Sequence, residues 1–145
     1  MANADASNVV LFIDVDDFKA VNEKAGHLIG DEILRIIFQT VLDIVGGLGD
    51  AYRWGGDEIA AFLPGADLTV GERLGQAIRG DVEKQCAAHQ KLADARVTTT
   101  VSVGVGAVAG RPAADWVTAQ VAELMKEVKK NGKNKVLART LLKGP

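Results

Sequence analysis

Acidic side chains form two short clusters, each following a stretch that is typical of a strand or a tight turn. The first begins at Asp14, directly after an apolar run, and the second is Asp57-Glu58, directly after Gly55-Gly56. Carboxylates crowded onto a turn repel one another unless a positive charge lies between them. Mg²⁺ prefers carboxylate oxygens as ligands. The residue types therefore predict a divalent-cation site, provided that the fold brings the two clusters together.

The glycine pair separates two short apolar runs, Ala51 to Trp54 and Ile59 to Leu63. This layout predicts a β-hairpin that turns at Gly55 and Gly56. We expect both glycines to reverse the chain with positive φ, and their missing Cβ atoms to leave room for a phosphate. A Gly-Gly turn beside acidic residues is also ordinary solvated turn chemistry, so the hairpin alone does not establish a site.

The first acidic cluster follows Val9 to Ile13, a run typical of a strand that is buried on both faces. Open α/β sheets bind ligands at such strand ends. Residues i and i+2 of an extended chain point the same way, so Asp14 and Asp16 are expected to face one site, and Val15 and Asp17 to face away. Alternatively, Asp16 or Asp17 caps the following helix.

A third group of charges is basic and lies at the end of the last predicted helix. Lysines favour helix C-termini because of the helix dipole, and this preference alone accounts for most of the group. Lys129 and Lys133 are four residues apart, so they can share one side of the helix end and reach a triphosphate. The group comprises Lys126, Lys129, Lys130, Lys133 and Lys135.

The remaining apolar periodicity predicts four helices, a loop and two further strands. The order β α α β β α β α β indicates an α+β class, with a ferredoxin-like or palm-type mixed sheet flanked by helices and a β-hairpin carrying the Gly-Gly-Asp-Glu turn. The strand at 96–108 is expected to be half-buried and paired with the hairpin. The predicted elements are helices at 18–25, 32–45, from Asp67 or Thr69 to about 91 and 116–130, a loop at 26–31, and strands at 96–108 and 133–137.

Composition predicts one soluble domain over residues 1–145 with a flexible N-terminus at 1–8. The chain has 145 residues, 48% of them hydrophobic and 25% charged, and a net charge of −2 that gives no basic field for duplex nucleic acid. A lone Cys86 excludes a disulfide framework and fits a reducing cytoplasm. The first eight residues are unlike a signal peptide, and the longest apolar segment, Ile33 to Val45, is too short and interrupted to span a membrane.

Five ordered stretches resemble the GGDEF family of diguanylate cyclases, in a variant whose signature ends in Ile59. The likeness covers nearly the whole chain, and five motifs in order are a stronger signal than Gly-Gly-Asp-Glu alone. The stretches are residues 12–22 (Phe-Ile-Asp-Val-Asp-Asp-Phe-Lys-Ala-Val-Asn), 26–31 (Gly-His-Leu-Ile-Gly-Asp), 53–59 (Arg-Trp-Gly-Gly-Asp-Glu-Ile), 99–105 and 129–134 (Lys-Lys-Asn-Gly-Lys-Asn).

The resemblance implies a single palm domain that binds one GTP and that, facing a second copy, condenses two GTP molecules into cyclic di-GMP with release of pyrophosphate. It implies Mg²⁺ or Mn²⁺ as the cofactor and a homodimer as the catalytic form. Carried over by position, Asp14, Val15, Asp57 and Glu58 are the metal residues, and Asp57, Glu58 and Lys19 are catalytic. The implied nucleotide-binding residues are Phe18, Asn22, Asp31, Gly55, Gly56, Lys129 and Lys133.

Several positions depart from the family pattern. Ile59 stands for the final Phe of the signature, Glu23 for an Asp, and Lys126 for a Tyr; Lys133 stands for an Arg, which keeps the charge but loses bidentate phosphate geometry. The family's Arg-x-x-Asp inhibitory site falls at Gly46 to Gly49 and is absent, so feedback inhibition through it is not expected. The family's helical lead-in is also missing, and we expect no sensor or regulatory domain in this chain.

Three functions remain open at this point. The first is a diguanylate cyclase. The second is another palm-type cyclic nucleotide synthase, similar to the minimal CRISPR polymerases, which can use ATP. The third is a catalytically silent GGDEF module that binds GTP or a protein partner. The intact acidic residues argue against the third function, and Asn22 with Asp31 argues for guanine over adenine.

Overall fold

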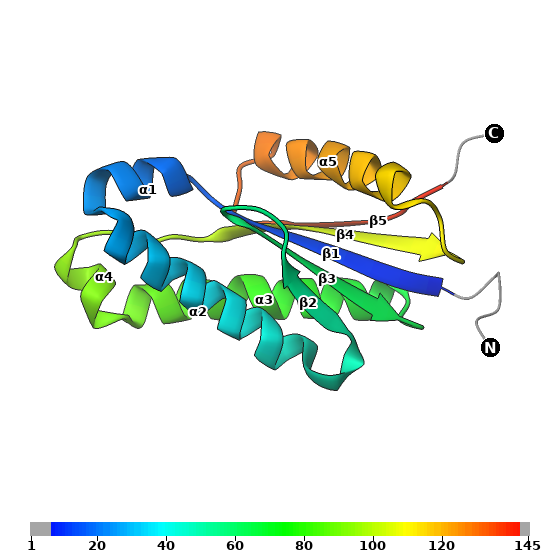
Figure 1. Cartoon of the computed structure of the whole chain (residues 1–145), viewed down its shortest axis with the longest axis horizontal. Coiled ribbons are helices and arrows are strands. Elements are labelled where there is room, and N and C mark those ends of the chain that lie inside the picture. The colour runs from blue at the N-terminus through cyan, green and yellow to red at the C-terminus, as the bar shows by residue number, and fades with distance from the viewer. Residues whose placement is uncertain (1–6, 143–145) are drawn as a thin grey trace.

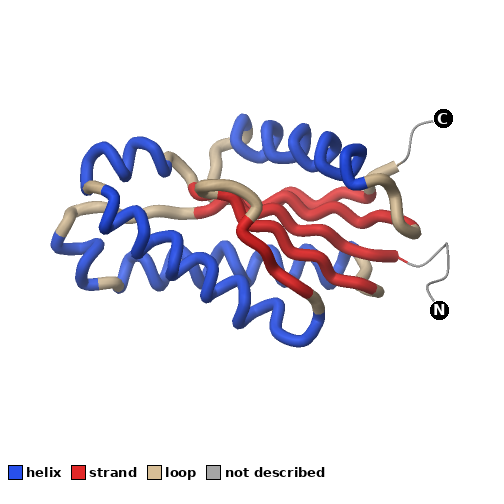
Figure 2. Tube along the Cα trace, in the orientation of Figure 1, coloured by secondary structure: helices blue, strands red, loops and turns tan. Residues whose placement is uncertain are grey.

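Five strands form one mixed sheet in the order β2-β3-β1-β4-β5 in the computed structural model, which describes residues 7–142 (Figures 1 and 2). Helix α5 covers one face of the sheet, and α2 and α3 cover the other. This is the predicted palm-type α+β fold. The elements are β1 (Ser7–Val15), α1 (Phe18–Ala25), α2 (His27–Val45), a 3₁₀ turn (Gly46–Leu48), β2 (Asp50–Arg53), β3 (Glu58–Pro64), α3 (Leu68–Ala88), α4 (Gln90–Asp94), β4 (Val101–Ala109), α5 (Ala114–Lys130) and β5 (Val136–Thr140).

Strand β1 lies at the centre of the sheet, as its apolar run predicts. Val9, Leu11 and Ile13 are fully buried in the core that the sheet forms with α2 and α3. The strand pairs antiparallel with both β3 and β4, and in this register Asp14 lies opposite Glu58 on one side and Ser102 on the other. The sheet therefore brings the two acidic clusters to one end.

The prediction for the strand at 96–108 is wrong in three respects. The strand begins at Val101, it is buried on both faces, and it pairs with β1 and β5 rather than with the hairpin. Both faces are buried because α3 lies on one and α5 on the other. The late start follows from the register, because Val101 pairs with Val15, the last residue of β1, and the residues before Val101 have no strand beside them in this ladder.

Helix α2 begins at His27, so the loop predicted at 26–31 is wrong. Gly26, at φ 88°, makes the whole break between α1 and α2. Gly30 does not interrupt the second helix, because its missing Cβ lets the backbone approach the Asn22 and Phe18 side chains of α1. In the sequence, a glycine that serves close packing between helices therefore resembles a loop boundary.

The helix predicted to run to about residue 91 ends at Ala88. His89 is extended, its Nε2 lies 3.0 Å from Glu32 Oε1, and α4 follows, with Leu92 fully buried. The predicted N-terminal cap is confirmed, since Asp67 Oδ1 accepts a hydrogen bond of 2.9 Å from the Val70 N–H.

The ends of the chain differ from prediction in two places. The last strand begins at Val136 instead of residue 133, because Lys133 and Asn134 have left-handed φ angles. Ser7 and Asn8, which fall in the predicted flexible segment, belong to β1. The Asn8 side-chain amide donates a hydrogen bond of 2.7 Å to the Gly110 carbonyl. The rest of that segment, 1–6, lies outside the described residues. The single domain over 1–145 stays a prediction.

Over residues 7–142 no helix combines the length and the apolar character that crossing a membrane would need.

Candidate functional site

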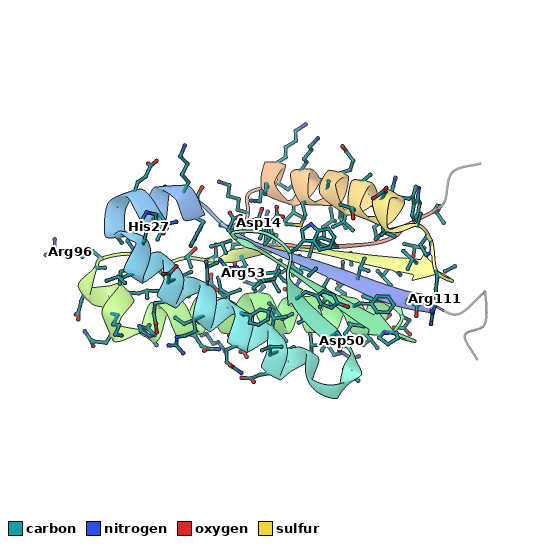
Figure 3. All side chains as sticks on the ribbon, in the orientation of Figure 1. Asp14, His27, Asp50, Arg53, Arg96 and Arg111 are labelled. Atoms are coloured by element: carbon teal, nitrogen blue, oxygen red, sulfur yellow. The ribbon has the colours of Figure 1, made fainter. Side chains whose placement is uncertain are left out.

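The two acidic clusters meet where β1 ends beside the hairpin turn. One carboxylate oxygen each from Asp14, Asp57 and Glu58 lies within 4.8 Å of the others. The sheet fixes this arrangement, because Asp14 pairs with Glu58 across β1 and β3. In addition, the Val15 N–H donates a hydrogen bond of 3.2 Å to the Asp57 carbonyl. Figure 3 shows Asp14 at this end of the strand.

The electrostatics of the cluster favour a cation. Burial raises the pKa of Asp14, Lys129 opposes that shift, and repulsion from Asp57 adds to it. Burial and then repulsion from Asp14 and Asp57 raise the pKa of Glu58. Asp14 Oδ1 is buried and has no hydrogen-bond partner among residues 7–142. An oxygen-only donor set with one unpartnered buried oxygen fits a hard divalent ion such as Mg²⁺.

The glycine turn differs from prediction in its backbone. Neither Gly55 nor Gly56 has a positive φ, because four residues rather than two span the reversal between β2 and β3. The N–H groups of Trp54 and Gly55 both donate to the Glu58 carbonyl, at 2.9 and 3.2 Å. The Arg53 guanidinium donates 2.8 Å to the Gly56 carbonyl. The expected open space is present at Gly56, where an added Cβ would meet no atom within 4 Å.

The prediction that Asp14 and Asp16 face one site is wrong. Both lie where β1 ends, but only Asp14 belongs to the acidic cluster. The buried carboxylate of Asp16 accepts hydrogen bonds from Thr100 Oγ1 at 2.7 Å, Ser102 Oγ at 2.6 Å and the Asn134 N–H at 2.9 Å. The alternative, a helix cap, is also wrong. Asp17 occupies the cap position of α1 at φ 54° but makes no side-chain cap hydrogen bond.

Both predicted phosphate-binding lysines lie at this end of the sheet. Lys129 Nζ is 2.6 Å from Asp14 Oδ2, and Lys133 Nζ is 2.5 Å from Asp17 Oδ1. The contact with Asp17 raises the pKa of Lys133. Lys19 lies exposed on α1 and makes no hydrogen bond or ion pair within residues 7–142.

The two residues expected to read the base lie on neighbouring helices. Asn22, on α1, has a buried Oδ1 atom that finds no hydrogen-bond partner in the described part of the chain. A Cβ on Gly30 would lie 1.8 Å from that oxygen and 3.3 Å from Phe18 Cζ, so the glycine keeps room for the Asn22 side chain. Asp31, exposed on α2, follows this glycine directly.

Two hollows lie beside the acidic cluster and share Glu58 in their linings. One, of about 340 Å³, contains Asp31 and Arg53 and reaches Glu58. The other, of about 250 Å³, contains Asp14 and Lys129 and also reaches Glu58. A ligand bridging the two hollows would have one end beside the predicted base-reading aspartate and the other beside the carboxylates and the lysine.

Sequence reasoning missed several residues around the site. Arg35 and Arg53 line the larger hollow; an arginine on an amphipathic helix, such as Arg35, is too common to be a signal, and Arg53 begins the signature stretch 53–59 but has no predicted role. Thr100 and Ser102 bind Asp16, and the available signal was their small polar side chains within a run of valines. Asn134 binds the same carboxylate through its backbone N–H, which no side-chain pattern reveals.

Comparison with protein families and curated proteins gives a consistent result. The family model described as "Diguanylate cyclase, GGDEF domain" matches residues 1–135. Diguanylate cyclase DgcM of Escherichia coli K12 is 34% identical over 130 residues, which are 89% of this chain and 30% of that protein. Diguanylate cyclase VdcA of Vibrio cholerae is 28% identical over 128 residues, 88% of this chain and 38% of that protein. The chain thus spans well under half the length of these relatives.

Solved structures share the fold. The GGDEF domain of DgcB from Caulobacter crescentus, solved in complex with c-di-GMP, superposes with a TM-score of 0.82 at 23% identity, covering 90% of this chain and 77% of that one. Diguanylate cyclase SiaD from Pseudomonas aeruginosa, solved with its activator SiaC, superposes with a TM-score of 0.82 at 25% identity. The match covers 94% of this chain and 50% of that one. The converging carboxylates, the glycine turn and the family match lead to one assignment: the chain belongs to the GGDEF domain family.

Proposed function

We propose that this domain is a diguanylate cyclase, which condenses two GTP molecules into cyclic di-GMP and releases two pyrophosphates. The observation that carries the proposal is the convergence of Asp14, Asp57 and Glu58 oxygens within 4.8 Å of one another. Membership of the GGDEF family supports it. The reaction needs a 3′-hydroxyl to attack an α-phosphate, and a cluster of carboxylates suits the metal-assisted form of that chemistry.

Asp14, Asp57 and Glu58, with the carbonyl of Val15, would hold the divalent ion, Mg²⁺ or Mn²⁺. When bound, such an ion lowers the pKa of a hydroxyl nucleophile and neutralises the charge that develops on a transferring phosphate. Lys129 supplies a positive charge beside Asp14.

The basic residues bind the polyphosphate in this proposal. Lys129 and Lys133 exchange their contacts with Asp14 and Asp17 for phosphate oxygens when nucleotide enters. Lys19 is exposed on the first turn of α1, and its charge stabilises the reacting phosphates. Lysine is a point charge, so these contacts give strength without the planar geometry of arginine.

Asn22 and Asp31 select guanine. A carboxylate accepts from N1–H and N2–H of guanine, and an amide donates to O6, whereas adenine leaves these groups unpaired. Phe18 lies beside Gly30 at the helix junction and offers an aromatic contact to the nucleotide. Gly56 leaves the hairpin turn open to the phosphates, and Gly55 brings the backbone of the same turn beside the Glu58 carboxylate, 3.4 Å from where a Cβ would lie.

One experiment separates this proposal from its alternatives. The protein is incubated with Mg²⁺ and each nucleoside triphosphate in turn, and products are identified by mass. The proposal expects cyclic di-GMP from GTP and no cyclic product from the others. A product from ATP supports the alternative palm-type synthase, and GTP binding without product supports a silent module; either result rejects the cyclase.

A further inference from the structure

The turn between α5 and β5 has an unusual backbone. Gly132, Lys133 and Asn134 are three consecutive residues with left-handed φ angles of 113°, 56° and 47°. Residues with a Cβ are unfavourable in this region, and such conformations persist only where the surroundings hold them. The contacts that hold this turn therefore determine where Lys133 lies.

Asp16 makes the main contact from the β1 side. One of its carboxylate oxygens accepts the Asn134 N–H at 2.9 Å and Thr100 Oγ1 at 2.7 Å, and the other accepts Ser102 Oγ at 2.6 Å. The residue is 4% exposed. A buried carboxylate is costly unless it is fully hydrogen-bonded, and here three donors from two other segments satisfy it.

Helix α3 holds the same turn from the opposite side. Asn134 Nδ2 donates 2.6 Å to Glu83, and Arg79 donates 3.1 Å to Asn134 Oδ1. Asn134 is thus fixed through its backbone by Asp16 and through its side chain by α3. The turn has little freedom to move relative to β1.

The turn also joins the two lysines that meet the exit of β1. Lys129 reaches Asp14 from the last turn of α5, and Lys133 reaches Asp17 from the turn itself. Asp16 lies between those two aspartates in sequence and binds the backbone of the residue next to Lys133. A single buried side chain therefore links the cation-binding strand end to the lysine-bearing turn.

We propose that Asp16 is a positioning residue for triphosphate binding. In this proposal Asp16 contacts neither nucleotide nor metal. It holds the α5–β5 turn in place, so that Lys133 in the turn and Lys129 just before it face the polyphosphate. This inference rests on the proposed function, because it assumes that these lysines bind the phosphates of GTP.

The test compares nucleotides that differ only in their phosphates. Binding of 3′-deoxy-GTP and 3′-deoxy-GMP, which lack the attacking hydroxyl and cannot react, is measured calorimetrically with Mg²⁺ for wild type and Asp16→Asn. The amide cannot accept all three donors. We expect the affinity for the triphosphate to fall roughly tenfold, as for loss of one charge-assisted contact, and that for the monophosphate to change less than about twofold.

Two further variants control the comparison. Asp43→Asn makes the same charge change on the exposed face of α2, where Asp43 accepts a hydrogen bond from Gln39, and should leave both affinities unchanged. Ser102→Ala removes one of the three donors and should give an intermediate loss for the triphosphate only. This milder variant decides the matter if Asp16→Asn does not fold, as judged by thermal unfolding.

The outcomes separate the two claims. Equal losses for both nucleotides, or no loss in a folded variant, would overturn the positioning role and leave the proposed function standing. A wild-type protein that binds the triphosphate no better than the monophosphate would reject the phosphate-binding lysines themselves, and the proposed function with them.

Discussion

At the scale of single residues, burial and mutual repulsion disfavour the charged forms of Asp14 and Glu58, and Lys129 offsets part of this effect. The folded-state pKa values of Asp14 and Glu58 are raised, so the folded state binds protons more tightly than the unfolded state. Stability from these groups is therefore present below the unfolded-state pKa values and is lost as the pH rises through the carboxyl range. A site that costs stability without its ligand is typical of catalytic clusters.

Replacing one carboxylate should therefore separate activity from stability. Asp57→Asn removes a proposed metal ligand from a surface turn, and we expect it to abolish cyclic di-GMP. Without added metal at pH 7, the free energy of unfolding of the variant should equal that of wild type or exceed it by no more than about 1 kcal/mol. The reason is that the charge of Asp57 no longer repels Asp14 and Glu58. Urea unfolding beside a product assay checks both; unchanged synthesis, or a large loss of stability, would contradict the account.

A substitution at Gly30 tests whether the Asn22 side chain contributes to nucleotide binding. A Cβ there would lie 1.8 Å from Asn22 Oδ1, so Gly30→Ala should displace the Asn22 side chain. We expect weaker binding of 3′-deoxy-GTP, by about tenfold as for a lost polar contact, with divalent-ion binding unchanged. Gly47→Ala is the matched control, because an added Cβ meets nothing within 4 Å. Equal affinities for the two variants would exclude this role of Asn22.

At the scale of elements, α3 contains glycines of two kinds. A Cβ on Gly71 would lie 2.7 Å from both Val9 and Val105, whereas one on Gly80 meets nothing within 4 Å. We expect Gly71→Ala to destabilise the protein by about 1–3 kcal/mol through overpacking. Gly80→Ala should stabilise it by about 0.4–1 kcal/mol, since the unfolded chain loses freedom. Thermal unfolding measures both, and the same sign for both would contradict the observed packing of α3 on the sheet.

These glycines also show how far sequence reasoning reaches. The strand β1, the hairpin and the acidic cluster could be predicted, because apolar runs and carboxylates leave local signals. The start of α2 could not, because Gly30 resembles a loop residue until its contact with Asn22 is known. Likewise, the three partners of Asp16 come from segments far away in the sequence, and one of them is a backbone N–H. Long-range contacts of that kind leave no periodic pattern.

At the scale of the whole molecule, the proposed reaction needs two domains. Each chain has one acidic cluster within its described residues and is proposed to bind one GTP, so synthesis requires two copies to face each other. We therefore expect the initial rate of cyclic di-GMP formation to rise more steeply than linearly with protein concentration. Initial rates over a dilution series check this expectation, and a strictly proportional rate over a range in which the protein is monomeric by light scattering would refute it.

The central claim is that the carboxylates of β1 and the hairpin turn together hold one divalent ion. Electron paramagnetic resonance of Mn²⁺ measures this directly, without turnover. We expect wild type and Asp43→Asn to bind one Mn²⁺ per chain equally well at pH 7, and Asp14→Asn and Asp57→Asn each to bind it with an affinity lower by more than roughly tenfold. Protonation should weaken wild-type binding as the pH falls through the raised carboxyl pKa values of Asp14 and Glu58. Mn²⁺ binding that is unaffected by either substitution would contradict the account.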